Sequence, residues 1–344
     1  MKFAVGYQLA EAGEPPFPEV AADYLDSIAE VYFPWLDAPS GRASLTNRRG
    51  YVNWAGQRRL EEDLRFFRRR GVKLDLLFNA SCYGRLAVSE YLARQVASVL
   101  EHLGETAGGA DIVTTASPAV AHVVKKHFPG VEVRASVNMR IGTVKGMQYL
   151  AGLFDSFHLQ REYNRDFERI RELKAWSDRA GVKLLMLANS GCLAFCSGQS
   201  FHDNLVAHEV EIDETRNLPG WTPHICWNYY RDRETWVSVL QNCWVRPEDL
   251  HLYEPYFPVV KLATRMHARP GMVLDAYVRR RFHGNLLDLF EPGFGPAFAP
   301  FIIDNDRFPA DWMVRVSACG RDCHRCDYCR SVLDRVLVKV DEGA

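Results

Sequence analysis

Short apolar runs recur along the chain and alternate with longer segments that carry a helical pattern. The runs are almost continuously apolar, which is typical of strands buried on both faces of a parallel sheet. We expect eight such strands, at residues 2–8, 30–36, 73–80, 110–116, 131–138, 155–160, 182–189 and 258–265.

The segments between these runs have the periodicity of amphipathic helices. In residues 164–180, Phe167, Ile170 and Leu173 recur in three-residue steps and define one apolar face. Strands that alternate with helices in this way predict an α/β fold, a (β/α)8 barrel of the TIM type. Residues 38–55 have a loop-like composition and stay unassigned. Further helices are expected at residues 57–70, 87–103 and 119–128.

Two regions do not follow the alternation. Residues 190–257 form a long cysteine-bearing insertion between the last two predicted strands, and a long aperiodic segment inside a compact domain is usually functional. After Phe282 the chain becomes rich in proline and glycine and ends in a cysteine-rich tail, with a short helical pattern at residues 330–340. We therefore expect a barrel domain at residues 1–282, with the insertion, and a linker with a metal-binding tail at residues 283–344.

The composition is that of a globular protein with a large core. The chain has 344 residues, of which 47% are hydrophobic and 25% charged, and its formal net charge is −1. A nucleic-acid partner is not expected, because the chain has no bulk basic field to attract phosphates. The first apolar run is too short for a signal peptide, and no run reaches the roughly 18 residues of a membrane span. We expect a cytoplasmic protein whose thiols stay reduced.

The chain contains nine cysteines, of which Cys82 stands alone. Cys192, Cys196, Cys226 and Cys243 all lie in the insertion, where four converging thiolates can hold zinc or an iron–sulfur cluster. Structural zinc sites normally show two closely spaced cysteine pairs, and only the first pair is close here. The irregular spacing therefore favours a buried [4Fe–4S] cluster. The alternative is that some of these thiols are core residues.

The tail run CGRDCHRCDYC contains four more cysteines in eleven residues, which is too dense for core packing. Its spacing is close to a reversed bacterial ferredoxin motif. The run predicts a second metal site that holds either zinc or a second [4Fe–4S] cluster, with iron and sulfide favoured. The four ligands are Cys319, Cys323, Cys326 and Cys329.

Polar residues follow at least five of the predicted strands, at the end of the barrel where TIM-type active sites lie. Each could instead cap a helix or stabilise a loop, but their number indicates a polar pocket. His202 and His208 follow the first cysteine pair, and the pKa of an imidazole suits proton transfer. The catalytic candidates are Arg161, Glu162 and His202, and the substrate-binding candidates are Asn79, Tyr83, Asn138, Gln160, Lys261 and Arg265.

Three stretches of the sequence resemble the peptidase U32 family. They are HLQREYNRDFERIRELK from His158, LLMLANSGCLAFCSGQSFHDN from Leu184, and VRPEDLHLYEPYFPVVKLATR from Val245. The resemblance covers residues 1–282 and is most specific at residues 155–265, so the tail lies outside it.

The resemblance implies a barrel that carries a [4Fe–4S] cluster on four cysteines. Cys192, Cys226 and Cys243 match family positions. Cys196 departs from the usual family spacing and is similar to the C-x3-C pair of the branch that includes accessory proteins of the ubiquinone pathway. The tail is similar to extensions found in a subset of the family.

The resemblance also implies several functions. We expect an iron–sulfur redox enzyme, such as an oxygen-independent hydroxylase of a small organic substrate, with prephenate as a possible oxygen donor and with an electron-donor protein or a U32-type partner subunit. The alternatives are a non-catalytic iron–sulfur partner subunit, an RNA-modifying hydroxylase, and a peptidase. The near-neutral charge argues against RNA. A peptidase would need a nucleophile outside the cluster ligands, and Cys82 is the only spare thiol.

Overall fold

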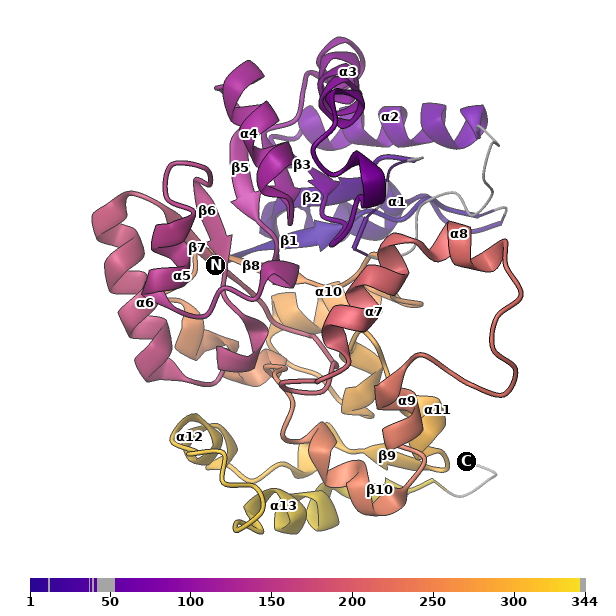
Figure 1. The fold of residues 1–344 in the computed structure, drawn as a ribbon. Coiled ribbons are helices and arrows are strands. Elements are labelled where there is room, and N and C mark those ends of the chain that lie inside the picture. The colour runs from indigo at the N-terminus through magenta and orange to yellow at the C-terminus, as the bar shows by residue number, and fades with distance from the viewer. Residues whose placement is uncertain (12, 37, 39, 42–52, 341–344) are drawn as a thin grey trace.

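The strands of the protein close into a parallel barrel. The structure is a computed structural model and describes residues 1–11, 13–36, 38, 40–41 and 53–340 (Figure 1). Within this part of the chain each strand pairs with the next and the last pairs with the first, which confirms the TIM-type barrel and all eight predicted strands. The strands are β1 (Lys2–Gly6), β2 (Ile28–Pro34), β3 (Lys73–Phe78), β4 (Ile112–Thr115), β5 (Glu132–Ala135), β6 (Ser156–His158), β7 (Lys183–Leu187) and β8 (Val259–Leu262).

Helices follow the strands, and side-chain caps fix where several of them begin. Asn53, Ser89 and Asp166 each accept a hydrogen bond from a backbone N–H in the first turn of α2, α3 and α6. Most of the unassigned segment, residues 42–52, lies outside the described residues. In the described part of the chain no helix combines the length and the apolar character needed to cross a bilayer. The helices are α1 (Phe17–Ala21), α2 (Trp54–Arg68), α3 (Glu90–Ala107), α4 (Pro118–His127), α5 (Val144–Tyr149), α6 (Phe167–Ala180) and α10 (Pro270–Arg279).

The insertion leaves the barrel at the end of β7 and returns at β8. Asn189 holds the two ends together, because its Nδ2 donates to the carbonyls of Ala263 and Leu289 and its Oδ1 accepts from the Ala263 N–H at 2.6 Å. The helices of the insertion are α7 (Gln199–Ala207), α8 (Glu209–Asp213) and α9 (Ile225–Tyr229), followed by the 3-10 helices η5 (Arg233–Val239) and η6 (Pro247–Tyr253).

The segment after Phe282 is folded and packs against the insertion, in the lower part of Figure 1. Trp236 of the insertion stacks on Phe298 with ring centroids 4.4 Å apart. The expected helix at residues 330–340 begins earlier and ends at Val336, because Leu337–Lys339 pair with an antiparallel strand. The elements are η7 (Leu286–Leu289), α11 (Gly295–Phe298), β9 (Phe301–Ile303), η8 (Asn305–Arg307), α12 (Trp312–Ser317), α13 (Tyr328–Val336) and β10 (Leu337–Lys339).

A buried arginine organises the polar part of the barrel interior. Arg134 on β5 is 1% exposed, and its guanidinium donates to both carboxylate oxygens of Glu30, at 2.6 and 3.0 Å. It also donates to Glu132 at 2.8 Å. Asp75 lies 3.6 Å from the guanidinium, and burial raises the pKa of its carboxyl to about 6. Since buried charges are tolerated only when paired, these carboxylates and Arg134 hold β2, β3 and β5 together across the interior.

We expect Arg134→Met to lower the free energy of unfolding by about 3–5 kcal/mol, because Glu30 and Glu132 lose their buried cation. Lys183→Met is the matched control, since the Lys183 ammonium pairs with Glu132 from an exposed position and its loss should cost less than about 1 kcal/mol. Urea denaturation at neutral pH measures both values. Equally small losses in the two variants would contradict the structural role of Arg134.

Candidate functional site

The four cysteines of the insertion come together although they are far apart in the sequence. Cys192 and Cys196 lie in the loop after β7, Cys226 lies in α9, and Cys243 follows η5. Burial raises the pKa of the Cys226 thiol to about 11, and the nearby thiolates of Cys192 and Cys196 add to the shift. Burial also raises the pKa of Cys243 to about 12, with smaller contributions from the charges of Glu162 and Cys192. These charge effects place Cys192 within electrostatic reach of both Cys226 and Cys243, and Cys196 within reach of Cys226. We call these four cysteines the insertion thiol group.

Asn242 ties together the segments that carry these thiols. Its Oδ1 accepts from the Ala194 N–H at 3.1 Å, and its Nδ2 donates to the Gly191 carbonyl at 3.0 Å, on either side of Cys192. The same Nδ2 donates to the hydroxyl of Tyr230, which follows α9. Asn242 is 2% exposed and directly precedes Cys243, so its amide fixes three parts of the insertion thiol group at once.

Two of the predicted catalytic residues lie beside this group. Arg161 and Glu162 begin the turn after β6, and both side chains are buried. The Glu162 carboxylate is close enough to Cys243 to raise the pKa of that thiol, after the larger effect of burial. Glu162 Oε2 is buried and accepts no hydrogen bond from any described residue. Arg161 Nε lies 4.0 Å from Glu162 Oε1.

The tail cysteines form a second group, the tail thiol group. Burial raises the pKa of Cys329 to about 11, Arg165 lowers it, and the charges of Cys323, Cys319 and Cys326 raise it further. Cys319, Cys323 and Cys326 are exposed and Cys329 is half-buried. The tail thiol group therefore lies at the surface, with one ligand facing the interior.

Arg165 connects the two groups. It is buried and fully engaged by backbone carbonyls, with donors 2.8–3.0 Å from the oxygens of Trp244 and Leu240. Its charge acts on Cys243 of the insertion thiol group and on Cys329 of the tail thiol group. One guanidinium thus lies within electrostatic reach of both groups.

A column of aromatic rings runs between the same two cysteines. Trp244, which follows Cys243, stacks on Trp312 with centroids 5.9 Å apart and planes at 17°. Trp312 stacks on Tyr328, which precedes Cys329, at 6.1 Å and 19°. The guanidinium of Arg165 lies 4.2 Å above the Trp244 ring. The two thiol groups therefore belong to one packed unit, although the sequence places them in separate regions.

The donor set of each group suits an iron–sulfur cluster. Four cysteine thiolates are the usual ligands of a [4Fe–4S] cluster, and each binds a different iron. Burial is the main cause of the raised pKa values of Cys226 and Cys329, and the charges of neighbouring thiolates raise them further, so a bound cation would favour the deprotonated thiols. Among the described residues no three His, Cys, Asp or Glu side chains stand at the spacing of a single metal ion.

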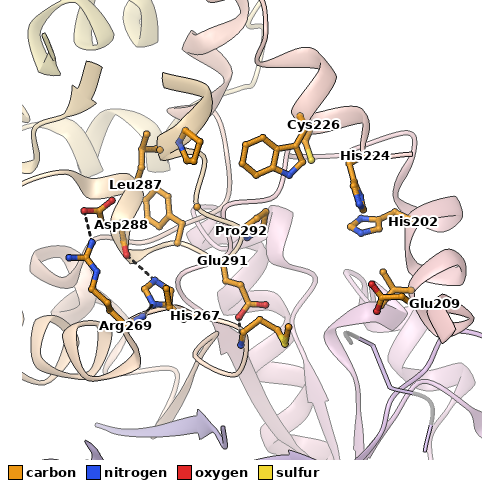
Figure 2. A pocket seen from close by; sticks show the side chains of 18 residues that line it. His202, Glu209, His224, Cys226, His267, Arg269, Leu287, Asp288, Glu291 and Pro292 are labelled. Atoms are coloured by element: carbon orange, nitrogen blue, oxygen red, sulfur yellow. Dashed lines mark hydrogen bonds and ion pairs between the residues drawn. The ribbon is translucent and has the colours of Figure 1, made fainter. Parts of the chain in front are cut away.

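A pocket of about 520 Å³ opens next to the insertion thiol group. Figure 2 shows His202 and His224 side by side on the wall that also carries Cys226, with ring centroids 4.9 Å apart. Glu291 lies between this wall and the opposite one, which carries His267 and Arg269 (Figure 2). The predicted catalytic residue His202 thus lines a pocket of mixed apolar and ionisable side chains, whose wall also carries the predicted ligand Cys226.

The predicted substrate-binding residues divide into three sets. Asn79 and Asn138 converge at Gly41, where an added Cβ would lie 2.9 and 2.5 Å from their amide nitrogens. Arg265 is close to them in the fold, because its Nη1 donates to Ser40 at 3.1 Å. Together these side chains line the centre of the barrel mouth.

The remaining candidates lie deeper or face other partners. The Lys261 ammonium lies 3.9 Å above the Tyr32 ring inside the barrel, and burial lowers its pKa to about 8. Tyr83 donates its hydroxyl to the Phe78 carbonyl at 2.8 Å, which engages it with its own strand. The Gln160 side chain packs against Gly142, where an added Cβ would lie 2.6 Å from Gln160 Oε1.

Comparisons with known proteins agree with this architecture. No family model matches the chain. The uncharacterized protease MJ1657 of Methanocaldococcus jannaschii is 22% identical over 285 residues, which are 81% of each chain. The structure of the U32 peptidase Mk0906 matches with a TM-score of 0.54 at 16% identity, over 76% of this chain and 92% of that chain. The chain is thus similar in sequence to a protein described as a protease, and in fold to a U32 peptidase.

Several residues of the candidate site were not found from the sequence. His224, Glu291 and Arg269 line the pocket, and Arg165 bridges the thiol groups. Glu291 lies in the Pro- and Gly-rich stretch that the sequence suggests is a linker. Arg165 directly follows the Arg161–Asn164 turn, but a single arginine at a helix start gives no signal of its own. Only the position of His224 two residues before Cys226 could have drawn attention to it.

We expect Arg165→Met to lower the free energy of unfolding by about 2–4 kcal/mol, because the buried carbonyls of Trp244 and Leu240 lose their donors. Arg169→Met is the matched control on the next turn, where the guanidinium pairs with the exposed Glu172 and should contribute less than about 1 kcal/mol. Denaturant unfolding of anaerobically purified protein measures both. If Arg165→Met has the same free energy of unfolding as the parent protein, Arg165 does not stabilise the contact between the two thiol groups.

Proposed function

We propose that this protein is an iron–sulfur oxidoreductase of the U32 family that hydroxylates, or otherwise oxidises or reduces, a small organic substrate without O2. The observation that carries the proposal is the position of the insertion thiol group beside a pocket that is lined by ionisable side chains as well as apolar ones. Cys192, Cys196 and Cys243 come from segments up to 51 residues apart and meet Cys226, whose side chain lies in the pocket wall. One inorganic centre shared by the four thiolates would account for this convergence.

In this proposal the insertion thiol group holds a [4Fe–4S] cluster, and the tail thiol group holds a second [4Fe–4S] cluster or zinc. A bound cluster would supply one-electron transfer or Lewis-acid chemistry next to the pocket. The chain supplies the rest. Arg165 keeps a positive charge between the two groups, which offsets part of the negative charge of eight thiolates.

Cationic and amide side chains would bind the substrate at the barrel mouth. Arg265 can hold a carboxylate with its planar guanidinium, and Asn79 and Asn138 can donate hydrogen bonds beside it. Lys261 lies below them as a buried cation. These groups suit a carboxylate-bearing substrate or an oxygen donor such as prephenate, which the family resemblance suggests.

Proton transfer would fall to His202 or Glu162. His202 faces the pocket together with His224, so one imidazole can accept a proton while the other stabilises it. Glu162 offers an oxygen without a hydrogen-bond donor among the described residues, and it lies beside Cys243. A redox cycle also needs an external partner, and the exposed Cys319, Cys323 and Cys326 place the tail thiol group where an electron-donor protein or a partner subunit can approach.

A peptidase is the second candidate, because the relative from Methanocaldococcus jannaschii and the matching solved structure are described as a protease and a peptidase. Thiols that hold a cluster cannot act as nucleophiles. The peptidase candidate therefore requires a catalytic group outside both thiol groups. Release of peptide fragments by the metal-free protein would favour it over the redox function.

Anaerobic purification with iron and sulfide analysis tests the proposal. We expect a coloured protein in which Cys192→Ala removes the iron of the insertion thiol group and leaves the tail metal in place. Cys326→Ala should remove only the tail metal, and zinc analysis of the same samples identifies it. Isolation of a colourless protein that contains only zinc, or no metal, and still turns over its substrate would refute the redox function.

Asn242→Ala should reduce the iron retained by the insertion thiol group by at least half, because the loops that carry Cys192 and Cys243 lose their shared amide. Asn228→Ala is the control, since Asn228 lies in the same insertion but is exposed, and its side-chain amide donates to the Thr222 carbonyl at 3.3 Å. Iron analysis after desalting measures retention. Equal iron contents in the two variants would show that Asn242 does not position the ligands.

A further inference from the structure

The ninth cysteine has its own chemical environment, away from both thiol groups. Cys82 lies in the loop after β3, at the rim of the barrel mouth, and is half-buried. The backbone N–H of Gly84 donates to its sulfur at 3.3 Å. Gly84 has a φ of +52°, a conformation that glycine adopts readily, so the loop can turn its N–H back toward the sulfur.

A histidine from the insertion reaches this cysteine. His208 ends α7 and hydrogen bonds with the Cys82 side chain. An added Cβ on Gly84 would lie 3.5 Å from His208 Cε1, so the ring closes directly over the Cys82 loop. His208 Nδ1 is 3.1 Å from a carboxylate oxygen of Glu211 in α8, which leaves Nε2 for the sulfur. A thiol, an imidazole and a carboxylate are thus arranged in series.

The electrostatics agree with this geometry. The hydrogen bond from His208 lowers the pKa of Cys82, and the Gly84 N–H contributes in the same direction. The hydrogen bond to Cys82 raises the pKa of His208, and the bond to Glu211 adds to the shift. The charged groups that act on the pair are His208 and Glu211 themselves. Both shifts act in the direction that favours a thiolate beside an imidazolium.

We propose that Cys82, His208 and Glu211 form a nucleophilic site for acyl transfer, with small esters or thioesters as the substrate class. In this site Cys82 is the nucleophile, His208 the proton donor and acceptor, and Glu211 the residue that orients the imidazole. The inference does not rest on the redox proposal, because none of the three residues belongs to a thiol group or to the pocket of Figure 2.

The reaction balances with these groups alone and water. The Cys82 thiolate attacks the acyl carbon, a C–S bond forms, and the bond from that carbon to the leaving oxygen or sulfur breaks as the His208 imidazolium donates its proton. Water then attacks the thioester, His208 accepts the proton from water, and the acid is released with regeneration of the thiolate. No oxidant or cofactor is needed.

A redox switch at Cys82 fits the structure less well. Reversible disulfide formation needs a second thiol, and the other eight cysteines are distributed over the two thiol groups. A disulfide also makes no use of an imidazole oriented by a carboxylate. A nucleophile that forms and breaks an acyl bond uses both, because each half of the reaction transfers one proton.

The test uses the full-length protein, purified anaerobically, with p-nitrophenyl acetate as the acyl donor. We expect a burst of p-nitrophenol close to one equivalent, and an acetyl group on the peptide that contains Cys82 when the reaction is quenched in acid. His208→Ala should slow acetylation of Cys82 at least tenfold, and Glu211→Gln should slow it several-fold. His251→Ala is the control, because His251 is an exposed histidine that bonds only to the Glu248 carbonyl.

Two further measurements separate catalysis from mere thiol exposure. The burst rate should be proportional to the fraction of Cys82 that is present as thiolate. The burst should therefore persist at pH values below those at which the Cys82 thiol of the denatured chain loses its reactivity. Cys82→Ala should abolish the burst and leave the iron and sulfide content unchanged, so a failure here is distinguishable from a failure of the redox proposal. Acetylation of Cys82 at equal rates in the parent and in His208→Ala would overturn the inference, as would a burst that survives in Cys82→Ala.

Discussion

The architecture of the site depends on the closure of the insertion by Asn189. This buried amide joins the carboxyl end of β7 to the backbone that follows β8 and to the last residue of η7. The insertion therefore begins and ends at one point on the barrel mouth. The cysteines of the insertion can meet only because their loop is anchored there. Separation of the two ends would leave the Asn189 amide buried without these partners, which is costly.

A second set of contacts makes the C-terminal segment part of the same unit. The aromatic column from Trp244 through Trp312 to Tyr328 joins the insertion to the tail, and Arg165 lies beside it. Arg321, in the tail between two cysteines, donates to the carbonyl of Glu162 in the turn after β6. The tail is therefore packed on the barrel at the predicted catalytic turn.

The fold could be read from the sequence because its signals are local and repeated. Eight apolar runs of strand length, separated by amphipathic segments, are compatible with few architectures other than a parallel barrel. The division of eight cysteines into two groups was also predicted from the sequence, since thiols that are neither expected to form disulfides nor spaced like core residues indicate a metal site. The carboxyl ends of the strands located Asn79, Asn138 and Arg265 at the mouth for the same topological reason.

What the sequence did not disclose depends on contacts between distant segments. Glu291 enters the pocket because the Gly191 N–H bonds to its carbonyl, a pairing across 100 residues that no local pattern encodes. The pairing of Cys82 with His208 likewise requires knowledge of where α7 ends. The helical pattern at residues 330–340 was read correctly up to Val336, but the change to a strand is imposed by β9, which offers an unpaired edge.

Helix α7 has a consequence for how the molecule can respond to its surroundings. His202, in the first turn of α7, lines the pocket, and His208 at the end of the helix contacts Cys82. Between them Asp203 is bound to Arg140 of the barrel at 3.0 Å. A shift or rotation of α7 would displace both histidines together. A molecule that binds at one of the two places and moves the helix would therefore change the geometry at the other.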